Sequence, residues 1–335
     1  MATKPCSFVS NTRYTIPMTM TRSFACYDLA VDIGGTHIRA ALYPAGRRQQ
    51  VARGDIPTQG EQPPHERLAA LLRDLWPSQG TVQGIGVASP GPLDPYRGVI
   101  LATPNIPQWR DFPLVRFLQE RFAVPVVLDN DANAAALGEW RYGAGVGHHH
   151  LLYFTVSTGI GGGVIVEDRL LRGAAGLAGE LGHITVLPDG PLCGCGQRGH
   201  LEAVSSGTAI ARAAEEELAR GVPSRLARAP RPLTAALVAE AAHQGDALAQ
   251  AVLSRAAHFL GRAIADYLHI FNPTIVILGG GVVRAGEVFL RPLREALHAS
   301  VMTPAYLDGL TMTTARLGDD AGLLGALALL RESQP

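Results

Sequence analysis

The sequence predicts a mixed α/β protein built from two domains. The chain has 335 residues, more than the ~150 typical of one domain, and its 47% hydrophobic composition can fill a large core. A strand, a glycine turn and a second strand occur at residues 29–43 and again at residues 151–166. Short apolar strands alternate with helical stretches elsewhere, which is typical of sheets covered by helices. The repeated hairpin indicates two domains that are built alike and face each other.

The individual elements follow from local composition. Glycines between the apolar runs of both hairpins permit the unusual backbone angles of a tight turn. Short apolar runs predict further strands at 84–88, 125–128 and 274–278. The Arg-, Ala- and Pro-rich segment 220–232 is expected to join two helices. Helices are expected at 64–76, 114–122, 132–142, 205–219, 246–271, 287–299 and 320–331.

These elements suggest a domain division. Residues 1–26 mix basic, polar and proline residues and are expected to form a disordered tail. A small N-terminal α/β domain is expected over 27–128, completed by a C-terminal helix at 320–332. A large α/β domain is expected over 129–319, with a metal loop at 183–202.

Composition excludes several classes of protein. The 29 basic and 29 acidic side chains give a formal net charge of zero, so no nucleic-acid or membrane partner is expected. No run approaches the ~20 apolar residues of a membrane helix, and residues 1–28 lack the apolar core of a secretory signal. Two of the four cysteines are separated by one glycine, unlike a disulfide scaffold, which favours a cytoplasmic protein with a metal site.

A missing lysine restricts the chemistry. Lys4 is the single lysine of the chain, so neither a Walker-type phosphate loop nor a Schiff-base lysine has a candidate in the predicted domains. Any phosphate must therefore be bound by backbone N–H groups and other side chains.

Three glycine turns can bind an anion instead. Backbone N–H groups of such turns approach phosphates closely, and an aspartate at a strand end can hold Mg²⁺ through water. One turn alone could be an ordinary hairpin, but three at strand ends predict a nucleotide-binding cleft. The candidate residues for nucleotide and Mg²⁺ are Asp32, Gly34, Gly35, Thr36, Thr158, Gly159, Gly161, Gly279 and Gly280.

A polar run marks the junction of a strand with an alanine-rich helix. Asp131 there has two alternative roles, as the cap of the helix or as the acceptor of a substrate hydroxyl proton. In the second role, Asn130 would orient the hydroxyl.

The metal loop carries the most specific pattern. His183, Cys193, Cys195 and His200 supply the two imidazoles and two thiolates of a closed, structural zinc site. The alternative is a loop with incidental cysteines. Glu180 and Glu202 flank these residues, and their carboxylates suit a polyhydroxy substrate. The second ring nitrogen of His183 can donate to a substrate oxygen or to a carboxylate.

Together these motifs resemble the ROK family of sugar kinases and related repressors over residues 27–330. The carrying motifs are Asp32-Ile-Gly-Gly-Thr36, Pro104-Asn105, Asn130-Asp131, the turn at 158–163, Glu180-x-Gly-His183 and Cys193-x-Cys195-Gly-x-x-Gly. The resemblance implies a two-domain actin-like ATPase fold with ATP in an interdomain cleft, Asp131 as the base that activates a sugar hydroxyl, and a homodimer. It implies sugar contacts from Asn105, Asn130, Gly159, Glu180, His183 and Glu202.

The family usually has a third cysteine where this chain has His200, so we expect a His₂Cys₂ zinc set. Segment 103–113 resembles the glucokinase branch, which favours glucose as the substrate and ATP with Mg²⁺ as the donor. Fructose, N-acetylmannosamine and N-acetylglucosamine are alternatives, as is polyphosphate as the donor. A sugar-responsive regulator is disfavoured because residues 1–28 show no helix-turn-helix pattern.

Overall fold

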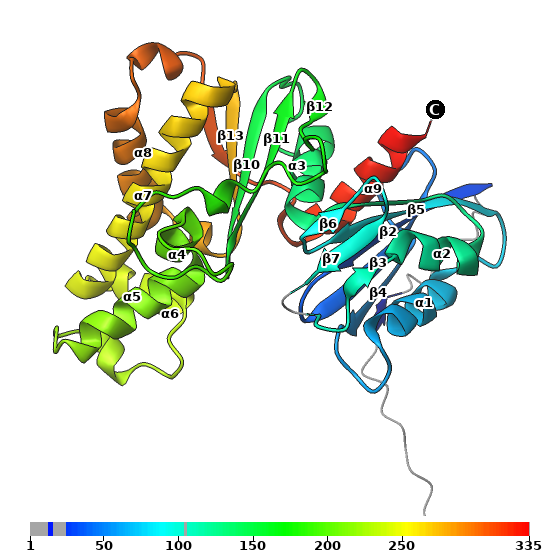
Figure 1. The fold of residues 1–335 in the computed structure, drawn as a ribbon, viewed down its shortest axis with the longest axis horizontal. Coiled ribbons are helices and arrows are strands. Elements are labelled where there is room, and N and C mark those ends of the chain that lie inside the picture. Colours follow the sequence, from blue (N-terminus) through cyan, green and yellow to red (C-terminus); the bar gives the residue numbers. More distant parts are fainter. Residues whose placement is uncertain (1–12, 16–24, 104–105, 335) are drawn as a thin grey trace, which may run out of the picture. The chain divides into compact units, whose positions relative to one another are not determined.

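The chain divides into two compact units (Figure 1). The computed structural model describes residues 13–15, 25–103 and 106–334. The first unit comprises Met1–Ala134 with Gly322–Pro335, and the second comprises Ala135–Ala321. The chain therefore crosses between the units twice, once within α3 (Asp131–Tyr142) and once at the start of α9 (Ala321–Ser333).

The first unit contains a six-stranded sheet with the order β1-β4-β3-β2-β5-β9. Strand β2 pairs antiparallel with β3 and parallel with β5, and β5 pairs parallel with β9. A separate three-stranded sheet holds β6, β7 and β8. The strands are β1 (Arg13–Thr15), β2 (Cys26–Ile33), β3 (His37–Pro44), β4 (Ala52–Pro57), β5 (Thr81–Ser89), β6 (Leu93–Asp94), β7 (Val99–Ala102), β8 (Arg110–Phe112) and β9 (Val126–Asn130).

Two parts of the segment expected as a tail form strands. Arg13–Thr15 form β1, which pairs antiparallel with β4, and Cys26 begins β2. A strand edge offers unpaired backbone groups, so a short polar segment can pair there without an apolar pattern of its own. Residues 1–12 and 16–24 of the expected tail lie outside the described residues.

The two faces of this sheet pack against different helices because successive strand residues point to opposite sides. Val31 of β2 belongs to a core cluster with leucines of α1 (Pro64–Leu75) and α2 (Leu114–Phe122). Ala30, its neighbour, belongs to a second cluster with Leu327 of α9. The small side chains on that face let α9 approach the sheet closely.

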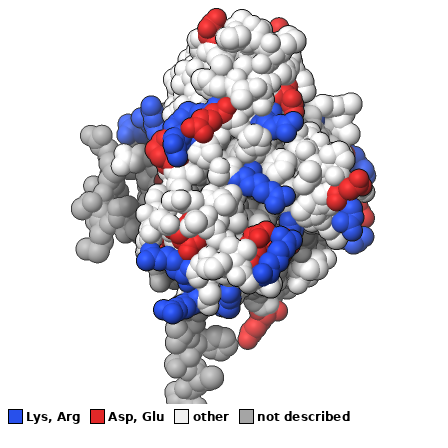
Figure 2. Space-filling view, turned by 90° about the vertical axis from the view of Figure 1, so that its left-hand side faces the viewer, with Lys and Arg blue, Asp and Glu red and all other residues white. Residues whose placement is uncertain are grey.

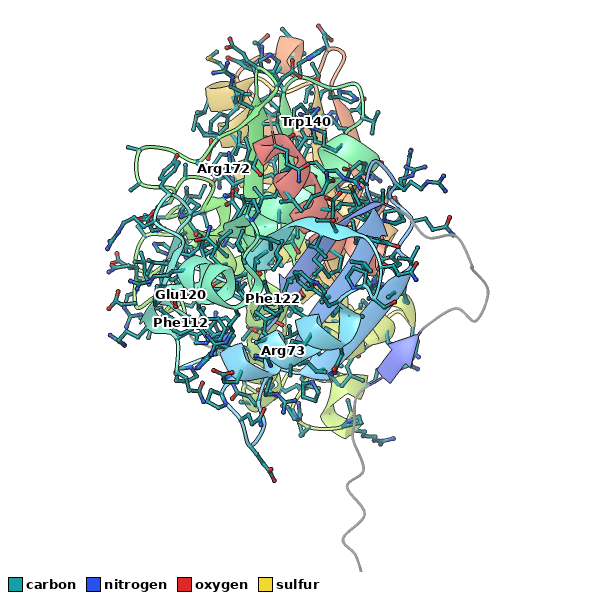
Figure 3. All side chains as sticks on the ribbon, turned by 90° about the vertical axis from the view of Figure 1, so that its right-hand side faces the viewer. Arg73, Phe112, Glu120, Phe122, Trp140 and Arg172 are labelled. Atoms are coloured by element: carbon teal, nitrogen blue, oxygen red, sulfur yellow. The ribbon has the colours of Figure 1, made fainter. Side chains whose placement is uncertain are left out.

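Aromatic contacts link α1 to α2 and to β8. Figure 3 labels two of the rings involved, Phe112 and Phe122. Trp76, which follows α1, stacks on Phe122 at the end of α2 with ring centroids 5.0 Å apart. Phe112 at the end of β8 lies 4.9 Å from the ring of His65 on α1. Such pairs contribute about 0.5–1.5 kcal/mol beyond their buried area, so they help to hold α1 beside α2 and β8.

The second unit repeats the topology of the first. Its five-stranded sheet has the order β12-β11-β10-β13-β14. Strand β10 pairs antiparallel with β11 and parallel with β13, and β13 pairs parallel with β14. In the first unit, β2 pairs in the same way with β3 and β5, and β5 pairs parallel with β9. The strands are β10 (Leu151–Val156), β11 (Ile160–Val166), β12 (Arg169–Leu170), β13 (Ile275–Gly279) and β14 (Thr311–Thr314).

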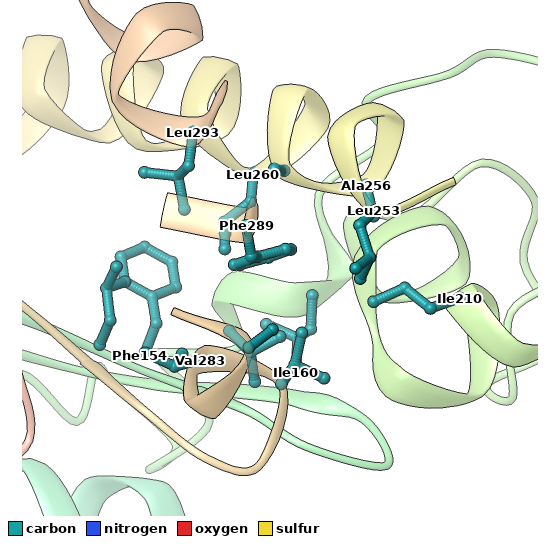
Figure 4. Close-up of a cluster of buried hydrophobic side chains, with 14 of the residues drawn as sticks. Phe154, Ile160, Ile210, Leu253, Ala256, Leu260, Val283, Phe289 and Leu293 are labelled. Atoms are coloured by element: carbon teal, nitrogen blue, oxygen red, sulfur yellow. The ribbon is translucent and has the colours of Figure 1, made fainter. Parts of the chain in front are cut away.

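Helices α4 to α8 form the main core with one face of this sheet. Phe154 of β10 packs with Leu260 of α7 and Phe289 of α8 (Figure 4). These helices are α4 (Leu201–Ser205), α5 (Gly207–Ala219), α6 (Ala235–His243), α7 (Ala247–Phe271) and α8 (Glu287–Ser300). Single 3₁₀ turns are η1 (Leu181–His183), η2 (Arg225–Arg228), η3 (Val282–Ala285), η4 (Pro304–Tyr306) and η5 (Gly318–Asp320).

Both predicted hairpins are confirmed, as β2–β3 and β10–β11. The helix expected at 205–219 begins later, because the Ser206 hydroxyl accepts from the Ala209 N–H at 3.2 Å and caps α5. Strand β4 was not predicted, since its Arg, Gly, Asp and Pro residues are depleted in strands and pairing with β3 overrides that preference. Helix α6, capped by Thr234, was also not predicted.

Charged side chains are spread over the surface. Figure 2 shows basic and acidic residues interspersed on one face rather than gathered in a single patch. The Arg212 Nε lies 3.6 Å from the Glu216 Oε1, and the Arg231 Nη1 lies 3.7 Å from the Glu215 Oε1. Among the described residues, no helix has both the length and the apolar character needed to cross a membrane.

Gly86 of β5 offers a test of how α9 packs on the sheet. A Cβ at this position would lie 2.0 Å from the carbonyl oxygen of Ala326. We expect Gly86→Ala to lower the free energy of unfolding by about 1–3 kcal/mol, because the backbone must shift. Gly281→Ala is the control, since Gly281 has φ −68° and no neighbour within 4 Å of an added Cβ. Urea denaturation measures both variants, and a Gly86→Ala protein as stable as the parent would contradict this packing.

Candidate active site

The four predicted metal ligands lie together in the second unit. Their ligand atoms, from His183, Cys193, Cys195 and His200, all lie within 4.8 Å of one another. The two histidine Nδ1 atoms are 3.3 Å apart. The Cys195 Sγ lies 3.2 Å from the His200 Nδ1, and the Cys193 Sγ lies 3.7 Å from the His183 Nδ1.

The separations of 3.2, 3.3 and 3.7 Å are close to those around a tetrahedral zinc ion, and the 4.8 Å limit of the whole cluster is somewhat wider. With Zn–N near 2.0–2.1 Å and Zn–S near 2.3 Å, a tetrahedron places its ligand atoms roughly 3.3–3.8 Å apart. Burial raises the pKa of Cys193 to about 12, so without a cation this sulfur is a neutral thiol. A bound metal stabilises the thiolate instead. The donor set, two thiols and two imidazoles, is one that zinc prefers.

Glycines give the metal loop its shape. Gly196 and Gly199 have φ values of 92° and 71°, which other residues rarely adopt. A Cβ at Gly199 would lie 1.7 Å from the carbonyl oxygen of Leu187, so the loop can close only around glycine. His200 then enters α4, which brings Glu202 into the first turn of that helix.

Glu202 connects the metal loop to the β10–β11 turn. Its Oε2 accepts from the Ile160 N–H at 3.0 Å, and its Oε1 accepts from the Cys193 thiol at 3.3 Å. A Cβ at Gly159 would lie 2.4 Å from the same Oε2, so the carboxylate occupies the space that a larger residue would need. Two motifs that were separate in the sequence therefore meet at one carboxylate.

Glu180 lies on the other side of His183. Its Oε2 is 3.9 Å from the His183 Nε2, so the ring directs Nδ1 to the metal cluster and Nε2 to this carboxylate. Burial raises the pKa of Glu180, while His183 opposes the shift. The Glu180 side chain remains 49% exposed, which leaves it accessible to a ligand.

In the first unit, Asn130 caps α3. Its Oδ1 accepts from the N–H groups of Ala132 at 2.8 Å and Asn133 at 3.3 Å, the usual contacts of a capping residue. Asp131 occupies the first helical position, half-buried, and its Oδ1 shares the Ala132 N–H at 2.8 Å. Asn130 is therefore the principal cap of α3, which was one of the two roles considered for Asp131.

Sequence reasoning missed Asp129. This carboxylate is 0% exposed and accepts from the Asn130 N–H at 2.8 Å and from the Asn133 Nδ2 at 3.0 Å. It fixes the backbone from which Asn130 and Asp131 project. Its place in the Asp-Asn-Asp run was a signal, but only burial distinguishes it from Asp131.

Asp32 is the second-to-last residue of β2, just before the first glycine turn. Burial raises the pKa of Asp32, and Arg39, with Nη1 3.8 Å from Oδ2, opposes the shift. A Cβ at Gly322 would lie 2.5 Å from the Asp32 carboxyl carbon, so the carboxylate lies against the N-terminus of α9. That helix end favours negative charge. Gly34, Gly35 and Thr36 form the adjacent turn.

The other two glycine turns flank one residue of β10. Thr155 pairs with Gly161 of β11 on one side and with Gly279 of β13 on the other. Gly280 follows with φ 90°, and a Cβ there would lie 2.3 Å from the Val156 carbonyl oxygen. The Thr158 carbonyl accepts from the Thr208 hydroxyl at 2.9 Å. Asn105, a further predicted sugar contact, lies outside the described residues.

The duplicated sheets and glycine turns define an actin-like ATPase fold. Residues 28–333 match the ROK family. The chain belongs to the ROK family.

Three comparisons describe its relatives. A glucokinase from Thermotoga maritima is 40% identical over 309 residues, covering 91% of this chain and 97% of the relative. An N-acetylmannosamine kinase from Shigella boydii is 37% identical over 306 residues, covering 91% and 98%. The crystal structure of a ROK family glucokinase from Streptomyces griseus, in complex with glucose and AMPPNP, superposes with a TM-score of 0.77 at 35% identity, covering 92% and 100%.

The assignment of the helix cap can be tested by stability alone. We expect Asn130→Ala to lower the free energy of unfolding by about 1 kcal/mol, because α3 loses its capping oxygen. Asp131→Asn keeps an acceptor at the first helical position and should cost no more than about half as much. Urea denaturation of both variants gives the comparison. The reverse order would make Asp131 the principal cap.

Proposed function

We propose that this chain transfers the γ-phosphoryl group of ATP to a hydroxyl of a hexose, with glucose as the substrate. The observation that carries the proposal is the set of different contacts that three consecutive residues, Asp129, Asn130 and Asp131, make at the start of α3. Asn130 caps the helix, Asp129 supports the backbone, and Asp131 follows them at the first helical position as the carboxylate that we assign as the base. The similarity to glucokinases supports glucose as the hexose.

Asp131 accepts the proton of the attacking sugar hydroxyl in this mechanism. The Asn130 Oδ1 is already engaged with the helix N-terminus, so its Nδ2 amide is the group that donates to the sugar. The helix N-terminus favours the ionised form of Asp131, which is the form a base requires.

The sugar hydroxyls are bound by residues around the metal loop. Glu180 and Glu202 accept hydroxyl hydrogen bonds, and each carboxylate has more than one lone pair for this purpose. The His183 Nε2 lies close enough to Glu180 to present its proton beside that carboxylate. Gly159, a further proposed sugar contact, has no side chain and so leaves room for the Glu202 carboxylate beside it. Asn105 completes the proposed set.

Backbone groups bind the nucleotide. The turns at Gly34–Thr36, Thr158–Gly161 and Gly279–Gly280 present N–H groups to the phosphates in place of a lysine. Asp32, near the end of β2, is the residue that would hold Mg²⁺. When bound, Mg²⁺ neutralises the charge that develops on the transferred phosphoryl group.

A zinc ion held by His183, Cys193, Cys195 and His200 completes the proposal. The closed His₂Cys₂ set leaves no position for an activated water, so the zinc is structural. The zinc holds in place the backbone that carries Glu180 and Glu202.

For the assembly and location of the protein, we propose a homodimer in the cytoplasm.

An N-acetylmannosamine kinase is the second candidate, because a relative of that name matches nearly the whole chain at 37% identity. The two substrates differ by an acetamido group at position 2 of the sugar. Selection between the two sugars depends on the space beside position 2 of the bound sugar. One extra or missing group in a pocket changes the transition-state binding free energy by about 1–3 kcal/mol.

A panel of sugars in a coupled ADP-release assay tests the function. Glucose should have the highest kcat/KM, ahead of fructose, N-acetylglucosamine and N-acetylmannosamine. Asp131→Asn should lower kcat by ~10²-fold or more while the fold survives, since the amide cannot accept the proton. Near-normal turnover in this variant would show that another group is the base. A higher kcat/KM for N-acetylmannosamine would favour the second candidate.

Elemental analysis tests the metal. Protein purified without added metal should contain one zinc per chain. The Cys193→Ser/Cys195→Ser variant should lose it and bind sugar more weakly, while nucleotide binding changes less, because the loop carries the sugar residues. Cys26→Ser is the control, since Cys26 lies in β2 of the first unit. Unchanged zinc content in the double variant would contradict the assignment.

A further inference from the structure

Glu139 is a buried carboxylate that the proposed chemistry does not use. It lies on α3, further along the helix than Asp131, and is 0% exposed. Its Oε2 accepts from the Ala144 N–H at 2.8 Å, and its Oε1 accepts from the Leu317 N–H at 2.7 Å. One side chain therefore binds two segments that are far apart in the sequence.

A glycine next to the Glu139 carboxylate leaves the space that it occupies. A Cβ at Gly143 would lie 2.0 Å from the Glu139 Oε2, so a larger residue at 143 would displace the oxygen. Glu139 is also close to the C-terminal end of α3, where the helix dipole disfavours a negative charge. A buried carboxylate in this place is costly unless donors satisfy it, and the two backbone N–H groups do so.

The Leu317 segment lies next to the nucleotide turn. Two residues earlier, the Ala315 N–H donates to the Leu278 carbonyl at 2.8 Å, which continues the pairing of β13 with β14. A Cβ at Gly279 would lie 3.3 Å from the Ala315 Cβ, so the segment packs on that glycine. Through Glu139, the helix that begins at Asp131 is joined to the strand end that carries the proposed phosphate contacts.

Both crossings of the chain between the units are also close to this contact in the sequence. The first crossing, at Ala134, lies in the same helix as Glu139, and the second, at Ala321, follows Leu317 by one 3₁₀ turn, η5. The hydrogen bonds of Glu139 thus tie the two connecting segments to each other within the second unit.

We propose that Glu139 is a positioning residue for phosphoryl transfer. It fixes the second-unit part of α3 to the segment before α9, which packs on Gly279. The consequence for catalysis rests on the proposed kinase function, whereas the link between the two segments does not. Loss of the link should lower kcat through misplaced groups, with sugar binding largely retained, because the sugar carboxylates lie on other elements.

Glu139→Gln removes one of the two acceptor oxygens, so the Ala144 and Leu317 N–H groups can no longer both be satisfied. We expect backbone amide exchange in residues 143–147 or 315–318 to accelerate by about 10-fold or more without substrate. We expect kcat to fall by roughly 10- to 100-fold, while the KM for sugar changes less than about 2-fold. Glu240→Gln, on the exposed side of α6, is the matched control and should leave both measurements unchanged.

Gly143→Ala is the second variant, because its Cβ displaces the same carboxylate without removing its charge. It should reproduce the faster exchange and the lower kcat, even where Glu139→Gln folds poorly. Either of two results would overturn the proposal: unchanged exchange in both segments of the folded variants, or faster exchange with parental kcat. A parent protein that phosphorylates no sugar would contradict the proposed function instead, and the exchange measurement would still decide whether the link exists.

Discussion

The site depends on one constraint of parallel sheets, namely that neighbouring parallel strands end at the same edge. In the first unit, β2, β5 and β9 are parallel, so Asp32 and the Asn130–Asp131 pair lie at the carboxyl ends of strands of the same direction. In the second unit, β10, β13 and β14 are parallel, which brings the turns after Val156 and Gly279 beside the segment that follows Thr314. The same topology, used twice, gathers residues that are widely separated in the chain.

Close contacts between glycines and carboxylates complete the arrangement. Glu202 lies against Gly159, Asp32 against Gly322 and Glu139 against Gly143, each with atoms 2.0–2.6 Å from where a Cβ would be. A carboxylate held this closely to the backbone accepts from main-chain N–H groups or lies at a helix end, as the Ile160 N–H bond to Glu202 illustrates. These glycines are thus required for the placement of charge, which differs from the usual need for a positive φ.

Much of the local structure was predictable. The β10–β11 hairpin has apolar runs on both sides of its glycines, and the candidate metal ligands have residue types and spacing that zinc prefers. Elements without such patterns were not predictable. Strand β4 carries residues that disfavour strands, and Arg13–Thr15 has no apolar pattern, so each is a strand because of its partner.

By itself, the sequence determined which chemical groups are available. Its single lysine, Lys4, lies outside the predicted domains. The sequence has three glycine turns, two thiols with two imidazoles, and an Asn-Asp pair at a strand end. Only the tertiary structure decided which contacts, and therefore which role, each of these groups has. Asn130 became the cap, because its oxygen reaches the helix N–H groups. Glu202 joined the metal loop to the hairpin turn, and Glu139 became a link between distant segments. Spacing along the chain cannot report these roles, because each depends on which backbone donor lies opposite a carboxylate or amide oxygen after folding.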